Sequence, residues 1–137
     1  MSLVLDSSVT LAWIHRNEST KAVEEVMERL SQGGGWVPNL WRLEVANVLE
    51  MNVRRSRYEA GFRDRALSDL ALFPIQVDSE SDRQAWGATL RLAERHRLTL
   101  YDAAYLELAV RRGLPLATLD RELRASARGE KVQLLGV

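Results

Sequence analysis

Short apolar segments alternate with longer stretches of helical spacing along the whole sequence, and this alternation limits the fold more than any other feature. The apolar segments, which predict strands, lie at 3–5, 36–38, 74–77, 114–119 and 132–137. The stretches between them predict helices at 7–16, 20–30, 39–56, 59–72, from 79 onward, at 98–113 and at 120–128. Such alternation requires crossover connections, which build a mostly parallel sheet with helices on both faces. We expect one α/β domain over residues 1–137, with a central sheet of about five strands.

For three of the predicted helices, the sequence also indicates which side chains are buried. Residues 39–56 have apolar side chains on nearly every face, so this helix needs more than one packing partner. Ser79 and Asp82 form a capping pattern for the next helix. Its inward stripe is predicted to be Ala85, Trp86, Thr89, Leu90 and Ala93. In 98–113, Glu107 falls on a different helical face from Asp102 and is predicted to lie at the surface.

The composition removes several classes of chemistry. Cysteine is absent and histidine occurs twice, which excludes disulfides, thiolate zinc sites and cysteine nucleophiles. A bound metal would be a hard cation held by oxygen atoms. No apolar run approaches the roughly 18 residues of a membrane span, and the opening MSLVLDSS lacks a secretory pattern. We therefore expect a cytoplasmic protein that does not enter a membrane.

Four acids fall where strands give way to helices. Asp6 ends the first strand, Glu44 lies early in the helix after the second, Asp102 begins a helix, and Asp120 follows the fourth strand. Sites in parallel sheets gather at the carboxyl ends of the strands. Each aspartate also fits a local role as a helix N-cap, and we expect Asp102 to serve as both cap and ligand. Carboxylates that converge repel one another unless a cation neutralises them, so capping alone explains the set poorly.

These acids sit in motifs that resemble the PIN-domain ribonucleases, and in size and motif most of all the VapC-like toxins of type II toxin-antitoxin pairs. The motifs are Asp6-Ser7-Ser8 after a strand, Glu44 in LEVANVL, YDAAYL at 101–106 and TLDREL at 118–123. The resemblance covers the whole chain. Each motif alone is weak, but four in the right order at the right predicted elements are specific.

The resemblance implies a metal-dependent endoribonuclease in a single PIN-like domain. Asp6, Glu44, Asp102 and Asp120 match the acids that hold one or two Mg²⁺ or Mn²⁺ ions and cleave RNA phosphodiesters. Thr118 matches a small hydroxyl residue that orients water or a ligand. Two positions, Ser8 and Asn47, match polar residues near the metal, although capping by Ser8 and a core hydrogen bond by Asn47 explain them equally well. The implied partners are RNA, a cognate antitoxin protein and a second copy of the chain.

Arginine dominates the basic residues, although the net charge is zero. Arginine suits phosphate recognition, and a GC-rich genome explains the same bias. The arginines nearest the acids in sequence, Arg16, Arg42, Arg121 and Arg124, are candidates for RNA contacts. Trp41 and the apolar helix around it are candidates for a dimer surface or for a groove that takes an antitoxin segment.

Two other α/β classes are excluded by particular positions. A receiver domain requires an acidic pair after the first strand, where Ser7 and Ser8 follow Asp6, and a lysine in the last strand, which has none. A phosphatase with an aspartyl nucleophile requires Asp-x-Asp, and Ser8 stands at its second acidic position. The remaining alternative is a non-catalytic PIN-like module that binds RNA or protein. Retention of all four acids favours the enzyme.

Overall fold

Five short parallel strands form one sheet in the order β3-β2-β1-β4-β5. The computed structural model describes residues 1–137. The strands are β1 (Leu3–Leu5), β2 (Gly35–Val37), β3 (Ile75–Val77), β4 (Leu116–Ala117) and β5 (Leu134–Leu135). The helices are α1 (Ser7–Ile14), the 3₁₀ turn η1 (Arg16–Glu18), α2 (Lys21–Gly33), α3 (Trp41–Arg54), α4 (Ala60–Leu70), α5 (Ser81–Gln84), α6 (Ala88–His96), α7 (Leu100–Arg112) and α8 (Arg121–Gly129). The predicted α/β fold and its five strands are confirmed.

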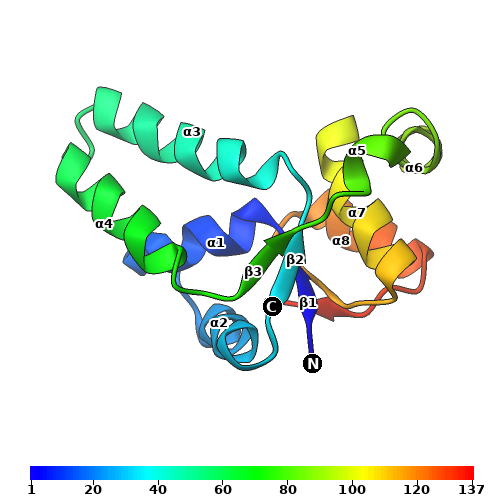
Figure 1. Ribbon diagram of the computed structural model, residues 1–137, viewed down its shortest axis with the longest axis horizontal. Helices are drawn as coiled ribbons and strands as arrows, with labels where there is room; N and C mark the ends of the chain where they lie inside the picture. The colour runs from blue at the N-terminus through cyan, green and yellow to red at the C-terminus, as the bar shows by residue number, and fades with distance from the viewer.

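The sheet divides the helices into two layers (Figure 1). Figure 1 shows α1 to α4 on one side of the strands and α5 to α8 on the other. The chain first builds outward from β1 through β2 to β3, and then returns to place β4 and β5 beyond the other edge of β1. Because right-handed crossovers in opposite directions put their helices on opposite faces, this order produces the two layers.

The strand order places a topological switch point between β1 and β4. These strands are neighbours, and the chain leaves their carboxyl ends in opposite directions. In open parallel sheets such a point leaves a crevice where ligands bind. All three residues of β1 are buried, which fits a central strand covered on both faces.

Residues at the ends of the helices explain several boundaries. The Thr20 side chain caps α2 by accepting a hydrogen bond from the Val23 N–H, 3.2 Å away. This helix runs through Gly33 and its C-cap is Gly34, so it stops within the glycine run at 33–35. Gly34 has a φ of 74°, a conformation that glycine adopts without steric cost. No helix combines the length and the apolar character that crossing a membrane would require.

The predicted helix from residue 79 is wrong in two respects. The chain breaks at residues 85–87 into the short α5 and the separate α6, and Trp86 lies in the break with 90% of its surface exposed. The buried stripe of α6 includes Thr89 and Ala93, as predicted, but its third member is Leu92. The capping pattern also fails, because the Ser81 hydroxyl donates to Asp78 at 2.8 Å, and neither Ser79 nor Asp82 caps the helix.

Glu107 is buried, contrary to the prediction that it lies at the surface. Helical periodicity identifies a single inward face, but α7 contacts α5, α6, α8, β1 and β4 and is enclosed over most of its length. Arg111, one turn further along, neutralises the buried carboxylate at 2.7 Å and also binds Asp78 at 2.6 Å. This arginine therefore ties α7 to the end of β3.

Candidate active site

The carboxyl ends of β1 and β4 meet at the side chains of Asp6 and Thr118. The Thr118 hydroxyl donates to Asp6 Oδ2 across 2.8 Å, and both residues are buried. The Ser8 hydroxyl donates to the same oxygen across 2.6 Å. Burial raises the pKa of Asp6, while these hydroxyl hydrogen bonds oppose that rise. The carboxylate is therefore held in one orientation at the switch point.

The two hydroxyls also fix the loop that follows β4. Ser8 Oγ accepts from the Leu119 N–H at 2.9 Å, and Thr118 Oγ1 accepts from the Asp120 N–H at 3.1 Å. Asp120 in turn caps α8, because its Oδ1 accepts from the Leu123 N–H at 2.9 Å. The predicted capping role of Asp120 is confirmed, and its second carboxylate oxygen is left for another partner.

Glu44 reaches the same region from the first turn of α3. Its carboxylate accepts a short hydrogen bond from the Tyr105 hydroxyl of α7. Burial raises the pKa of Glu44, the bond from Tyr105 opposes this, and the negative charges of Asp6 and Asp102 raise the pKa further. Burial also raises the pKa of the Tyr105 phenol, so this side chain stays protonated and donates a hydrogen bond.

Asp102 lies in the first turn of α7, but it is not the cap of that helix. The cap is Thr99, whose side-chain oxygen accepts from the Asp102 N–H at 3.1 Å. The Asp102 carboxylate is free of that local role. Burial raises its pKa to about 6, and the charges of Asp120, Asp6 and Glu122 contribute in that order. These three acids disfavour the charged form of Asp102, and a bound cation would stabilise that form.

The four predicted acids therefore come close enough to influence one another through their charges. The pKa of Asp102 responds to Asp120 and Asp6, and that of Glu44 responds to Asp6 and Asp102. In this structure, however, no three histidine, aspartate or glutamate side chains are grouped so that they could hold a metal ion together. The donors are all oxygen atoms, and their repulsion is what a hard cation would relieve, so the set fits Mg²⁺ or Mn²⁺ chemically.

The other candidates divide between the site and positions away from it. Ser8 belongs to the Asp6 network, whereas Asn47 is exposed and makes no core hydrogen bond. Arg16 lies beyond the last turn of the eight-residue α1, about 12 Å along the helix from its start beside Asp6. Arg42 and Arg121 are exposed near Glu44 and Asp120. Arg124 donates to the carbonyls of Thr118 and Leu135, at 2.7 and 3.0 Å, so it holds the loop after β4.

Three residues that influence the acids escaped the sequence argument. Tyr105 was not among the predicted site residues, yet its hydroxyl is a partner of Glu44. The Ser7 hydroxyl lowers the pKa of Glu44, and the Glu122 charge raises that of Asp102. The adjacency of Ser7 and Glu122 to Asp6 and Asp120 was the available signal. No sequence pattern indicates the pairing of Tyr105 with Glu44, which are 61 residues apart.

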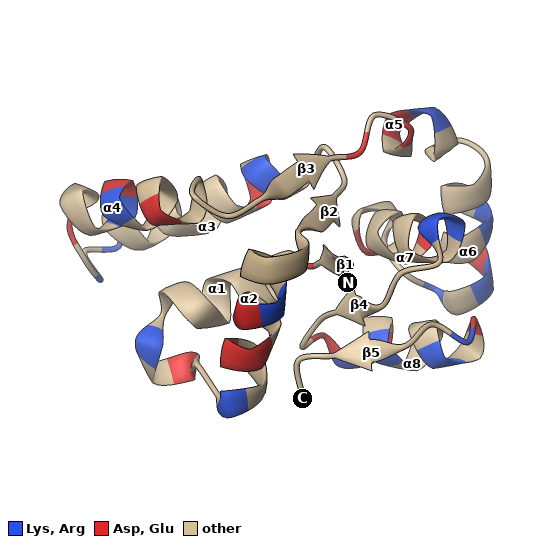
Figure 2. Ribbon diagram, turned by 60° about the horizontal axis from the view of Figure 1, so that its bottom comes forward, with Lys and Arg blue, Asp and Glu red and all other residues tan.

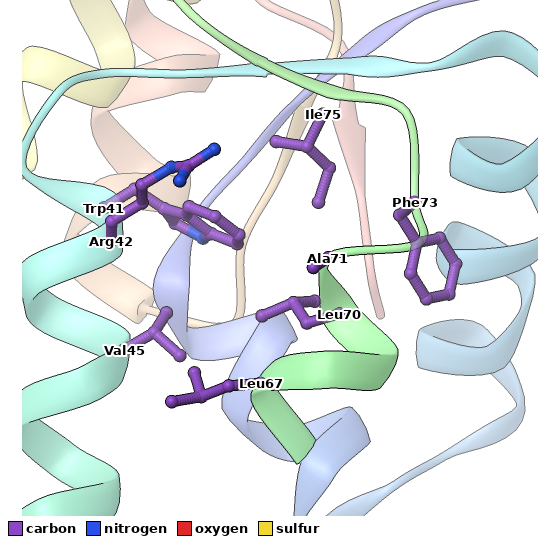
Figure 3. A pocket seen from close by; sticks show the side chains of 8 residues that line it. All are labelled: Trp41, Arg42, Val45, Leu67, Leu70, Ala71, Phe73 and Ile75. Carbon is purple, nitrogen blue, oxygen red and sulfur yellow. The ribbon is translucent and has the colours of Figure 1, made fainter. Parts of the chain in front are cut away.

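A separate apolar groove lies between α3 and α4 (Figure 3). Figure 3 shows α3 and α4 contributing side chains from opposite sides of this groove. Its volume is about 260 Å³, and seven of its eight lining residues are hydrophobic. The lining residues are Trp41, Arg42, Val45, Leu67, Leu70, Ala71, Phe73 and Ile75. Arg42 and Val45 lie within two residues of Glu44 in the sequence of α3, whereas the Glu44 side chain itself contacts Tyr105 of α7.

Comparison with protein families gives one family match over most of the chain. The model of the PIN domain matches residues 3–129. The sequence is 31% identical over 123 residues to Ribonuclease VapC3 of Pyrobaculum aerophilum, covering 90% of this chain and 92% of that protein. It is 36% identical over 87 residues to Exonuclease VapC9 of the same organism, covering 63% and 62%.

Two solved structures share the fold over nearly the full chain. The crystal structure of PAE2754 from Pyrobaculum aerophilum superposes with a TM-score of 0.70 at 26% identity, covering 98% of this chain and 92% of that one. VapBC2 from Rickettsia felis, solved bound to a DNA fragment from its promoter, gives a TM-score of 0.66 at 11% identity, with 98% and 97% covered. At that identity the second likeness concerns the fold alone.

Proposed function

The chain is a VapC-like member of the PIN domain family, and on that premise we propose that it is a metal-dependent endoribonuclease and the toxin of a type II toxin-antitoxin pair. One observation carries the proposal. The carboxylate of Asp6 is buried at the β1/β4 switch point, and two hydroxyl groups orient it within the electrostatic reach of further acids. A hydrolase that uses a hard cation requires such a set of oxygen ligands.

The roles of the side chains follow from their contacts. Asp6, Glu44, Asp102 and Asp120 are the proposed ligands, and Mg²⁺ or Mn²⁺, when bound, would supply an activated water and positive charge for the scissile phosphate. Ser8 and Thr118 orient Asp6, while Tyr105 orients Glu44. Neither histidine is needed as a base, because His15 contacts Tyr58 and Glu18, and His96 contacts Glu130.

The α3/α4 groove is the proposed place for an antitoxin segment. Its hydrophobic lining suits an apolar peptide. We propose that the antitoxin segment bound there extends to the acids and covers them. Leu43 is exposed on another face of α3, which supports the expectation that this helix has more than one partner and that a second copy of the chain packs against it.

The decisive experiment is RNA cleavage by the purified full-length protein without antitoxin. A circular RNA and a linear RNA labelled at one end are incubated with Mg²⁺ or Mn²⁺, with and without a chelator. Opening of the circle demonstrates internal cuts, whereas shortening of the linear RNA alone indicates the exonuclease activity that the name of VapC9 suggests. Asp102→Asn should abolish cleavage. Asp82→Asn, at an exposed aspartate in α5, is the matched control.

The alternative function is a module that binds RNA or protein without cutting. It would be favoured if the folded protein bound RNA but left both RNAs intact under every metal condition. It would be rejected if the circle opened and the opening required both the metal and Asp102.

A further inference from the structure

A polar cleft lies between the end of α6 and one face of α8. It is lined by His96, Arg97, Glu122, Ala125, Ser126 and Gly129. A Cβ atom at Gly129 would lie 3.2 Å from His96 Cε1, so the absence of a side chain there lets the imidazole pack closely against α8. The helical spacing of Glu122, Ser126 and Gly129 places them in one row along α8.

One end of this cleft adjoins the proposed active site. Glu122 belongs to the lining and lies in the first turn of α8, the helix that Asp120 caps through its side chain. Arg121 directly follows Asp120 and is exposed. The cleft therefore leads away from the four acids along α8 rather than forming an isolated hollow.

The charges around the cleft are unbalanced, although the whole protein is neutral. Arg91 pairs with Glu94, and Arg95 pairs with Glu130. The cations left without a carboxylate partner between Ala88 and Arg97 and between Arg121 and Lys131 are Arg97, Arg121, Arg124, Arg128 and Lys131. The only unpaired acid in these segments is Glu122, at the end next to Asp102. Figure 2 shows blue bands of basic residues on both α6 and α8.

The exposed arginines follow a line along α8. Arg121, Ala125 and Arg128 are exposed and have the i, i+4, i+7 spacing of one helical face. Arg121 and Arg128 are separated by about 10 Å along the helix axis, which is long enough for more than one nucleotide. Arg97 faces the same cleft from the end of α6 and adopts a left-handed conformation with a φ of 55°. This conformation commonly ends a helix, and here Arg97 is the C-cap of α6.

We propose that the α6/α8 cleft is a subsite for the phosphates of RNA on one side of the bond that is cut, with Arg97, Arg121 and Arg128 as the contacts. This inference rests on the proposed function, because it extends the substrate path from the same acids. The guanidinium group recognises phosphate through paired hydrogen bonds. The polar lining suits a sugar-phosphate backbone and offers little to an apolar peptide, which distinguishes this cleft from the α3/α4 groove.

The test measures RNA binding rather than cleavage, so it does not depend on activity. A fluorescent single-stranded RNA is titrated with the full-length protein in chelator, over a range of salt concentrations, and anisotropy gives the affinity. The variant carries Arg97→Gln and Arg128→Gln. The matched control carries Arg55→Gln and Arg65→Gln, which change two exposed arginines without ion pairs on the α3/α4 hairpin. Circular dichroism confirms that both variants are folded.

We expect the Arg97/Arg128 variant to bind about tenfold more weakly at low salt, and its plot of log affinity against log salt to be less steep by about 0.7 per lost contact. The control should keep the wild-type slope. An unchanged slope, an equal loss in both variants, or a folded wild-type protein that binds no RNA would each overturn the subsite. A protein that shows the expected slopes but cuts no RNA would support the subsite and refute the proposed nuclease.

Discussion

The Thr118 hydroxyl donates a hydrogen bond to Asp6 across 2.8 Å, although 112 residues separate the two in sequence. The contact joins the ends of β4 and β1, the strands on either side of the switch point. Because Thr118 also accepts from the Asp120 N–H, a single hydroxyl sets the positions of two of the proposed metal ligands. A substitution that removes the hydroxyl but keeps the shape of the side chain therefore separates this positioning role of Thr118 from its packing.

Thr118→Val tests this relationship with little change in side-chain shape. The variant leaves the Asp120 N–H without its acceptor and removes one donor from Asp6, so we expect a loss of about 1–3 kcal/mol in the free energy of unfolding. RNA cleavage should fall at least about tenfold, because the ligands lose their orientation. Urea denaturation and cleavage rates measure the two effects. Thr118→Ser keeps the hydroxyl and should retain most of the activity, and equal rates in both variants would contradict the prediction.

Tyr105→Phe removes the phenolic donor to Glu44 while keeping the buried ring. The pKa of Glu44 should then rise, because a bond that favours its charged form is lost. Since a metal binds the carboxylate form, the half-maximal metal concentration for cleavage should increase, and more so at lower pH. Metal titrations of activity at pH 6 and pH 8 measure this. The prediction fails if the variant needs the same metal concentration as the wild type at both pH values.

Asp102 should make the metal-free protein less stable as the pH rises. Its pKa is raised from 3.8 to about 6 in the folded state, so the folded protein holds a proton that the unfolded chain has released between these values. The free energy of unfolding therefore falls from about pH 4 to pH 6. Asp102→Asn should be more stable than the wild type at pH 8, by about 1–2 kcal/mol after allowance for partial exposure.

Urea denaturation in chelator at pH 4 and pH 8 measures the Asp102 effect. The advantage of the variant should disappear at pH 4, where the wild-type carboxyl is largely protonated in the folded state. An advantage of equal size at both pH values would indicate a packing effect rather than the release of charge repulsion.

Mg²⁺ or Mn²⁺ should stabilise the folded protein through the four acids. At a metal concentration about 100 times its Kd, binding to the folded state contributes about 2.7 kcal/mol, which corresponds to a rise in Tm of about 5–10 °C. A thermal unfolding series with added metal measures the shift. Asp6→Asn should lose the shift and Asp82→Asn should keep it. Identical shifts in both variants would place the bound metal elsewhere.

Trp41 and Trp86 should differ greatly in their contribution to stability. Trp41 is 5% exposed, lines the α3/α4 groove and donates its indole N–H to Thr10 at 3.1 Å. Trp41→Ala should cost about 3–5 kcal/mol. Trp86 lies exposed in the break between α5 and α6, so Trp86→Ala should cost less than about 0.5 kcal/mol. Urea denaturation of both variants is the measurement, and a large cost for Trp86→Ala would contradict the exposed placement.

The sequence determined the fold class and the list of acids, because both depend on short-range patterns. Apolar runs of strand length that alternate with helical periodicity require a parallel sheet flanked by helices. In such a sheet the carboxyl ends of all the strands lie at the same edge. Asp6 and Asp120 could therefore be assigned to one edge of the sheet from their positions after LVL and ATL. Asp120 stands at the start of the predicted helix 120–128, which likewise predicted that its side chain caps α8. The structure confirms this.

The tertiary structure alone decided which partners those acids have and which faces of the helices are enclosed. Tyr105 pairs with Glu44, and Thr118 with Asp6, through contacts between elements far apart in the chain. Glu107 was misplaced for the same reason, because periodicity identifies one inward face but does not report how many neighbours surround a helix. Local sequence fixes where a side chain lies along its own element, whereas its pKa, its hydrogen bonds and its burial depend on the elements packed against it.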